Sequence, residues 1–377
     1  MFAFLIVGLG AGLFWRSHSN SAAPQKPPVT KNTLNNPTPV HAYGIAAGSS
    51  LTTLNDAQLD ATLSGIEATG SSWVRLDFDW GLIQPDNKNS YDWTIYDKIV
   101  AASTKHHLQV LGILTYTPAW ARSSACADSD KCHPADPAQY ASFAAAAARR
   151  YKDSNVHCWE IWNEPNNPDF WQPAANPGEY TTLLKQAYAA VRAQDSYAYV
   201  ITGGLSPQAT TSTSYSPKAF LNGVYTAGGK GYFDAVGDHP YTFPLSPKST
   251  DDHAWVQMAS AQSSLRQIMI ANGDTNKKIW ITEFGAPTGG PGPVSTIAKP
   301  NLSAHPYVVD EALQAKILSD AVELYGSYSW VGPFFWYSYR DAGTAPTTNE
   351  NFFGLLRFNQ SQKPAYKIFQ DAAQAAR

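Results

Sequence analysis

From Tyr43 to the C-terminal end of the sequence, eight short apolar runs alternate with longer segments of helical pattern. Each run is apolar almost throughout, which is typical of strands buried on both faces of a parallel sheet. The runs lie at 43–46, 73–78, 109–114, 156–163, 199–204, 233–239, 278–284 and 331–337. Eight strand–helix units in one series predict an α/β fold, a (β/α)8 TIM barrel that forms one domain over residues 41–377. A doubly wound open sheet is the alternative, but it needs a Gly-rich nucleotide loop, which Gly203–Gly204 imitates only weakly.

Capping residues mark several of the intervening helices. Asn55 and Gln58 have the spacing of a capping box, and Gly70 is placed to close that helix. Asp136 before Pro137 has the pattern of an N-cap followed by the first helical residue. Further helices are expected through Ile95 and Ile99, over 137–151, 179–193, 218–227, 251–271 and 308–325, and after Pro364.

The N-terminal part of the sequence has a different composition. Residues 1–23 contain an apolar run from Phe2 to Trp15, which is short for a membrane span and resembles a signal-peptide core. Small residues at 21–23 suit a cleavage site, but no Lys or Arg precedes the run, so a cleaved signal and a retained membrane anchor both stay open. Residues 24–40 are rich in Pro and Asn and are expected to form a disordered linker. A cleaved signal and a retained anchor both predict a secreted or envelope-anchored protein whose barrel lies outside the cytoplasm.

Charge and cysteine content narrow the class of protein. The net charge is −3 and only 15% of residues are charged, so nothing indicates a nucleic-acid partner. Cys126 and Cys132 lie in one short polar stretch that could close as a disulfide. The alternative is a metal site formed by these two cysteines and His133, but no second ligand pair matches it. Cys158, inside an apolar run, is expected to be a small buried residue.

Polar residues at the carboxyl ends of the runs are the candidates for chemistry, because reactive groups of such barrels gather there. They are Asp77, Asp79, Asn163, Glu164, Asp238, His239 and Glu283. Glu164 and Glu283 stand out, since each ends an apolar run that breaks at once, at Pro165 and at Gly285. Strand alternation puts Glu160 on the same face as Glu164 but about 13 Å deeper, at ~3.3 Å per residue. We therefore expect Glu160 to be structural and to pair with Arg75.

Two carboxylates on the fourth and seventh strands would face each other across the barrel mouth. Such a pair suits glycoside hydrolysis, in which one carboxyl group protonates the leaving oxygen and the other attacks the anomeric carbon. The alternative is that both glutamates only hold cations or loops at the mouth.

The motifs Trp162–Asn163–Glu164–Pro165 and Thr282–Glu283–Phe284–Gly285 resemble those of the retaining glycoside hydrolases of clan GH-A. The stretch Glu160–Asn166 looks most like family 39, with family 5 as the close competitor. The resemblance covers the barrel and implies a catalytic domain in which Glu164 is the acid/base and Glu283 the nucleophile.

The same resemblance implies roles for the surrounding residues. Asn163 would bind the sugar 2-hydroxyl, and Arg75 would keep the nucleophile ionised. His239 and Tyr241 match the position of a hydrogen-bond partner of the nucleophile. Trp336 would form the aromatic floor of the cleaved subsite, and Trp120 is a candidate platform for a further sugar.

The predicted function is therefore hydrolysis of a β-glycosidic bond in a carbohydrate by an exported monomer that uses neither metal nor cofactor. The pattern after the barrel contains no β-sandwich, which favours a single-domain enzyme over a xylosidase. A non-catalytic sugar-binding barrel and a transglycosylase with the same residues are the alternatives.

Overall fold

The computed structural model describes residues 41–154, 156–302 and 307–377 of the protein. The expected signal or anchor (1–23) and the expected linker (24–40) lie outside the described residues. No helix in these three ranges is long and apolar enough to cross a membrane.

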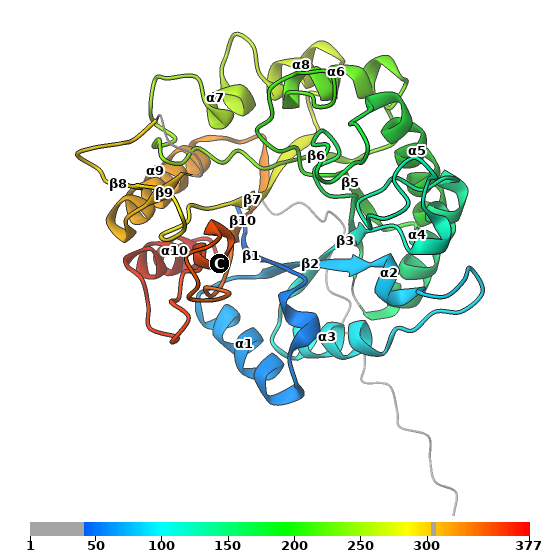
Figure 1. The fold of residues 1–377 in the computed structure, drawn as a ribbon, viewed down its shortest axis with the longest axis horizontal. Helices are drawn as coiled ribbons and strands as arrows, with labels where there is room; N and C mark the ends of the chain where they lie inside the picture. Colours follow the sequence, from blue (N-terminus) through cyan, green and yellow to red (C-terminus); the bar gives the residue numbers. More distant parts are fainter. Residues whose placement is uncertain (1–40, 155, 303–306) are drawn as a thin grey trace, which may run out of the picture. The chain divides into compact units, whose positions relative to one another are not determined.

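Eight parallel strands close into a barrel in the order β1-β10-β7-β6-β5-β4-β3-β2 (Figure 1). The predicted (β/α)8 fold is therefore confirmed. The barrel strands are β1 (Tyr43–Gly48), β2 (Trp73–Asp79), β3 (Gln109–Thr115), β4 (Cys158–Ile161), β5 (Tyr199–Thr202), β6 (Ala235–Asp238), β7 (Lys278–Phe284) and β10 (Val331–Tyr337).

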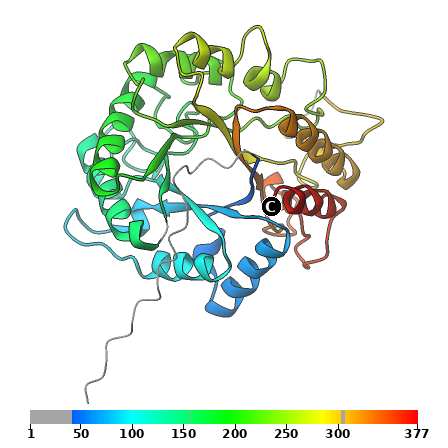
Figure 2. The same cartoon turned by 180° about the vertical axis from the view of Figure 1, so that it is seen from behind.

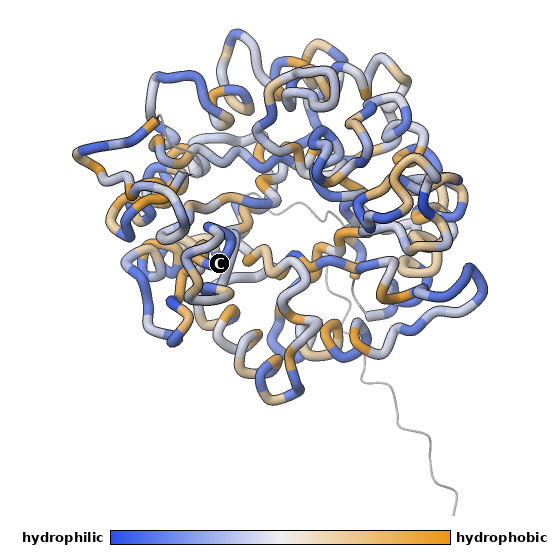
Figure 3. Tube along the Cα trace, viewed as in Figure 1, coloured by the Kyte–Doolittle hydropathy of each residue, from blue (hydrophilic) through white to orange (hydrophobic). Residues whose placement is uncertain are grey.

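Helices surround the barrel on all sides, as the two opposite views show (Figures 1 and 2). They are α1 (Asp56–Ala68), α2 (Trp80–Ile83), α3 (Thr94–Lys105), α4 (Pro137–Tyr151), α5 (Pro177–Gln194), α6 (Pro217–Thr226), α7 (Ala254–Ala259), α8 (Leu265–Ala271), α9 (Glu311–Ser327) and α10 (Pro364–Ala375). The capping box of Asn55 and Gln58 opens α1, and the Asp136 side chain caps α4 with Pro137 as its first residue. Apolar side chains of the strands and helices form the main core, whereas the loop between α2 and α3 is hydrophilic (Figure 3).

Besides shifts of one or two residues at the ends of other elements, such as β1, β5 and β6, the structure differs from the expected elements in three places. The helix predicted over 251–271 is two short helices, because the Ser264 side chain caps a new helix by accepting the Gln267 amide. Val308–Val309 does not begin a helix but forms strand β9, which pairs with β8 (Val294–Ser295), and α9 begins after its cap, Asp310. The fourth strand ends at Ile161, two residues before the predicted end at Asn163.

Candidate active site

The chain leaves strand β4 through an irregular turn that carries Glu164. Trp162 (φ 70°) and Glu164 (φ 45°) both adopt the left-handed region, which is uncommon for residues other than glycine and is often found at functional sites. The turn is fixed on both sides: the Trp162 indole donates to the Phe170 carbonyl, and the Glu164 amide donates to the Gly204 carbonyl. The expected depth of about 13 Å between Glu160 and Glu164 assumed an extended chain at ~3.3 Å per residue, and the chain is not extended there.

Glu283, near the end of β7, is surrounded by donors. The Arg75 guanidinium forms an ion pair with one carboxylate oxygen, and the Tyr241 hydroxyl donates to the other at 2.7 Å. Burial by itself raises the pKa of Glu283, but His239, Arg75 and Tyr241 together outweigh it, and the pKa is lowered. The surroundings of Glu283 therefore favour its ionised form.

Glu164 has a different set of partners. Its carboxylate accepts a hydrogen bond from His239 Nδ1 at 3.0 Å and another from the Asn167 side-chain amide at 3.1 Å. His239 Nδ1 lies farther from Glu283, at 3.8 Å. Tyr241 therefore takes the predicted place of a hydrogen-bond partner of Glu283, whereas His239 is hydrogen-bonded to Glu164 and lies close to Glu283.

The His239 ring is fully buried between the two glutamates. Burial by itself lowers its pKa, but the charge of Glu283 and the hydrogen bond to Glu164 outweigh burial and raise the pKa. His239 therefore provides a buried donor between the two carboxylates.

Arg75 links these groups to the barrel interior. Its guanidinium donates two hydrogen bonds to Glu160, at 2.7 and 3.1 Å, and one to the Asn163 side-chain oxygen at 3.0 Å. Both Arg75 and Glu160 are fully buried, which costs free energy because the two charges lose their water. The two parallel hydrogen bonds between them offset this cost. The Gly204 amide also donates to Glu160, and a Cβ at Gly204 would lie 2.1 Å from the His239 ring. The expected pairing of Glu160 with Arg75 is present.

The two candidate catalytic carboxylates converge in space. One oxygen of Glu164, one oxygen of Glu283 and one ring nitrogen of His239 all lie within 4.8 Å of one another. The same three groups could approach a metal ion, but Arg75 already supplies a positive charge to Glu283. The arrangement is a pair of carboxylates at a barrel mouth, one of them held ionised.

Of the two tryptophans predicted to stack on sugars, Trp336 does not lie in the expected way. The Trp336 ring is fully buried and donates to the Phe353 carbonyl, so it offers no face to a ligand. The error is one of strand alternation: its neighbour Tyr337 is the partly exposed ring of that strand. Trp120 is partly exposed, packs edge-on against Trp80 and donates to the Gln84 carbonyl. Its role as a platform for a further sugar stays a prediction.

Several residues around the glutamates were not predicted as site residues. The Tyr337 hydroxyl donates to Glu350 at 3.3 Å, and burial followed by the charge of Glu283 raises the pKa of Glu350. Asp77 on β2, which the sequence marks as a candidate at a strand end, is influenced by the charge of Glu283 as well. Asn167 could have been found from its place beside the Glu164 motif, whereas nothing in the sequence around Glu350 indicates a site.

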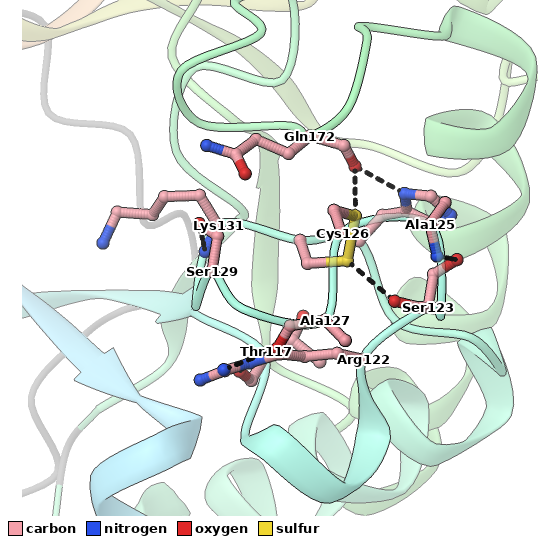
Figure 4. The surroundings of a disulfide bond; sticks show 11 residues. Thr117, Arg122, Ser123, Ala125, Cys126, Ala127, Ser129, Lys131 and Gln172 are labelled. Atoms are coloured by element: carbon pink, nitrogen blue, oxygen red, sulfur yellow. Dashed lines mark hydrogen bonds between the residues drawn. A yellow bond between two sulfur atoms is a disulfide. The ribbon is translucent and has the colours of Figure 1, made fainter.

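Cys126 and Cys132 form a disulfide, so their thiols are not available for the alternative metal site (Figure 4). The disulfide lies against Gln172, whose amide and carbonyl join the Lys131 and His133 backbone. Gln172 follows β4, so the disulfide loop is attached to the segment that follows Glu164. Cys158 is free and buried, as expected.

Comparisons with known proteins place this site in context. The chain matches the family model described as Cellulase (glycosyl hydrolase family 5) over residues 34–312. It is 28% identical over 227 residues to a beta-xylosidase of Caldicellulosiruptor saccharolyticus, covering 59% of this chain and 42% of the relative. A beta-xylosidase of Geobacillus stearothermophilus is 25% identical over 235 residues, covering 58% of this chain and 42% of the relative. The chain thus spans less than half the length of these curated relatives.

Solved structures share the fold. A family 39 glycoside hydrolase from Bacteroides cellulosilyticus WH2 aligns with a TM-score of 0.66 at 22% identity, covering 89% of this chain and 64% of that chain. A GH5_18 protein from Streptomyces cattleya, solved with GlcNAc, gives 0.64 at 16% identity, covering 90% and 80%. The matches are consistent with clan GH-A: the family model is that of the predicted competitor, family 5, and the structural neighbours include family 39 enzymes.

Proposed function

We propose that this chain, which belongs to the cellulase family (glycosyl hydrolase family 5), hydrolyses a β-glycosidic bond in an oligo- or polysaccharide by double displacement. Glu283 is the nucleophile and Glu164 the acid/base. The observation that carries the proposal is the convergence of the two carboxylates, with oxygens within 4.8 Å. Retaining glycosidases hold their carboxyl groups ~5–5.5 Å apart, whereas inverting enzymes leave ~6.5–9.5 Å for a water.

The first step uses the contrast between the two glutamates. The Glu283 carboxylate attacks the anomeric carbon while Glu164 gives its proton to the departing oxygen, and a glycosyl ester forms on Glu283. Arg75 and Tyr241 keep Glu283 charged and aimed at the anomeric carbon. His239 and Asn167 fix the Glu164 carboxyl group in the same space.

The second step reverses the proton transfer. Glu164, now a carboxylate, takes a proton from a water molecule whose oxygen attacks the anomeric carbon, and the ester bond to Glu283 breaks. The sugar leaves as the β-anomer. If a sugar hydroxyl takes the place of water, the same residues carry out transglycosylation, and only the products separate the two reactions.

We further propose that the barrel works outside the cytoplasm. The Cys126–Cys132 disulfide supports this, because disulfides persist in oxidising compartments. The names of the curated relatives make aryl β-D-xylosides the first substrates to test.

Glu164→Ala tests the acid/base role. A glycoside with a poor leaving group should lose roughly 10²–10⁴-fold in kcat/KM, because its departing oxygen needs a proton. A 2,4-dinitrophenyl glycoside needs no such proton, so its glycosylation step should be largely spared, and azide should accelerate turnover and yield the β-glycosyl azide. Equal losses for both leaving groups without azide rescue would contradict the assignment. Absence of wild-type hydrolysis across a broad glycoside panel would instead favour a non-catalytic sugar-binding barrel.

A further inference from the structure

Asp77 is a carboxyl group on the inner face of the barrel that the proposed reaction does not use. Along β2 the side chains alternate: Val74, Leu76 and Phe78 pack in the core outside the barrel, whereas Arg75 reaches Glu160 and Glu283 inside it. Asp77 therefore shares the inner face with Arg75 and lies about 7 Å closer to the mouth. Asp77 thus lies on the inner face of the barrel, toward the end of β2.

The Asp77 carboxyl group makes no hydrogen bond or ion pair within the part of the chain that the structure describes. Burial and the negative charges of Glu283 and Asp79 raise its pKa to about 7, against the opposing charges of Arg75 and Lys131. Arg75 is already occupied by Glu160, Glu283 and Asn163. Asp77 is partly exposed, so a ligand can reach its carboxyl group, and a ligand that donates hydrogen bonds to this acceptor would be favoured.

The surroundings of Asp77 form a wall for a ligand. Tyr116 follows β3, the neighbour of β2, and its ring packs against Trp162, two residues before Glu164. The Lys131 ammonium lies 3.6 Å from the centre of the Tyr116 ring. Lys131 belongs to the loop closed by the disulfide, and its side chain extends away from the disulfide (Figure 4).

We infer that Asp77 is a specificity-determining residue of the cleaved subsite: its carboxyl group accepts a hydrogen bond from a hydroxyl of a neutral sugar and disfavours a uronic acid. The inference rests on the proposed function, since it places the sugar against Glu283. A sugar hydroxyl can donate to Asp77, which supplies the missing partner. A sugar carboxylate facing β2 would meet the negative charges of Asp77, Asp79 and Glu283. The nearby cations Arg75 and Lys131 are already paired with other carboxylates, so the repulsion disfavours a uronic acid.

Asp77→Ala, compared with the wild-type full chain, tests this inference. The probes are the best 2,4-dinitrophenyl β-glycoside of a neutral sugar and its set of monodeoxy analogues. The wild type should discriminate against one analogue by roughly 10²–10³-fold in kcat/KM, because the Asp77 carboxyl group is left without the hydroxyl that donates to it. In Asp77→Ala the ratio of kcat/KM for the parent glycoside to kcat/KM for that analogue should fall close to one. A purely structural role of Asp77 would lower both rates and leave the ratio unchanged, and that result would overturn the inference.

Asp77→Asn provides the charge test. The wild type should hydrolyse the aryl β-glucuronide far more slowly than the neutral glycoside, and Asp77→Asn should narrow that gap by about tenfold. An unchanged ratio between the rates on the neutral glycoside and on the glucuronide would overturn the inference that Asp77 disfavours uronic acids. Asp79→Asn is the matched control, since an Asn side chain can still accept the Gly81 and Leu82 amides that cap α2. The Asp79→Asn variant should discriminate against the deoxy analogue as strongly as the wild type does.

Thermal melting checks that each variant is folded. Suppose that the wild type hydrolyses the panel and Glu283→Ala does not. If the Asp77 variants then leave both the deoxy-analogue ratio and the neutral-to-glucuronide ratio unchanged, only this inference fails. If Glu283→Ala turns over normally, the proposed function itself fails.

Discussion

Glu283→Ala is expected to lower kcat on activated aryl β-glycosides by on the order of 10⁴–10⁶-fold, because it removes the carboxylate that forms the glycosyl ester. Binding of substrate should be largely retained, since the side chain acts mainly in the transition state. Initial rates give kcat, and calorimetry of product or inhibitor gives the binding constant.

Glu323→Gln is the control for this variant. Glu323 lies on the exposed side of α9 and pairs with Lys248, a surface ion pair that contributes little. Its rates should equal those of the wild type. Undiminished turnover in Glu283→Ala would remove Glu283 from the mechanism.

Arg75→Met is expected to lower the free energy of unfolding by about 3–5 kcal/mol, because it leaves Glu160 as a buried charge without its bidentate partner. Turnover should fall as well, since Glu283 loses the cation that helps to keep it ionised. Denaturant unfolding followed by tryptophan fluorescence measures the first effect. The double variant Arg75→Met/Glu160→Gln should recover part of the loss, and strictly additive effects would contradict the coupling.

The same variant has a predictable pH dependence. The pKa of Glu283 in the folded protein is lowered, so its ionisation stabilises the fold above its unfolded pKa, and this contribution is lost as pH falls through the folded pKa. Arg75→Met removes part of that contribution. The loss of stability should therefore be larger at pH 7 than at pH 4. Arg150→Met, which breaks an exposed pair with Asp97, should show a small loss at both pH values.

The barrel could be predicted from the sequence because its strands are short, buried on both faces and separated by capped helices. The predicted bounds of β7 and β10 agree with the structure. The break in the helix expected over 251–271 could not be predicted in this way. It depends on the Ser264 side chain, which accepts a backbone amide and begins a new helix.

The candidate site was accessible to sequence reasoning only where a residue ends a strand. Glu164 and Glu283 follow this rule, and the structure brings them together. The choice between Trp336 and Tyr337 depends on strand alternation at the very end of β10, where a shift of one residue reverses the face. Glu350 comes from a loop remote in sequence, so only the folded chain reveals its place near Glu283.

The central claim is a retaining double displacement by Glu164 and Glu283. Proton NMR of the wild-type reaction tests it most directly, with 4-nitrophenyl β-D-xyloside or the best β-glycoside of the panel as substrate. Spectra are recorded in the first minutes, before the released sugar mutarotates. The account predicts that the β-anomer appears first and the α-anomer only later. First appearance of the α-anomer would show inversion and contradict the proposed mechanism.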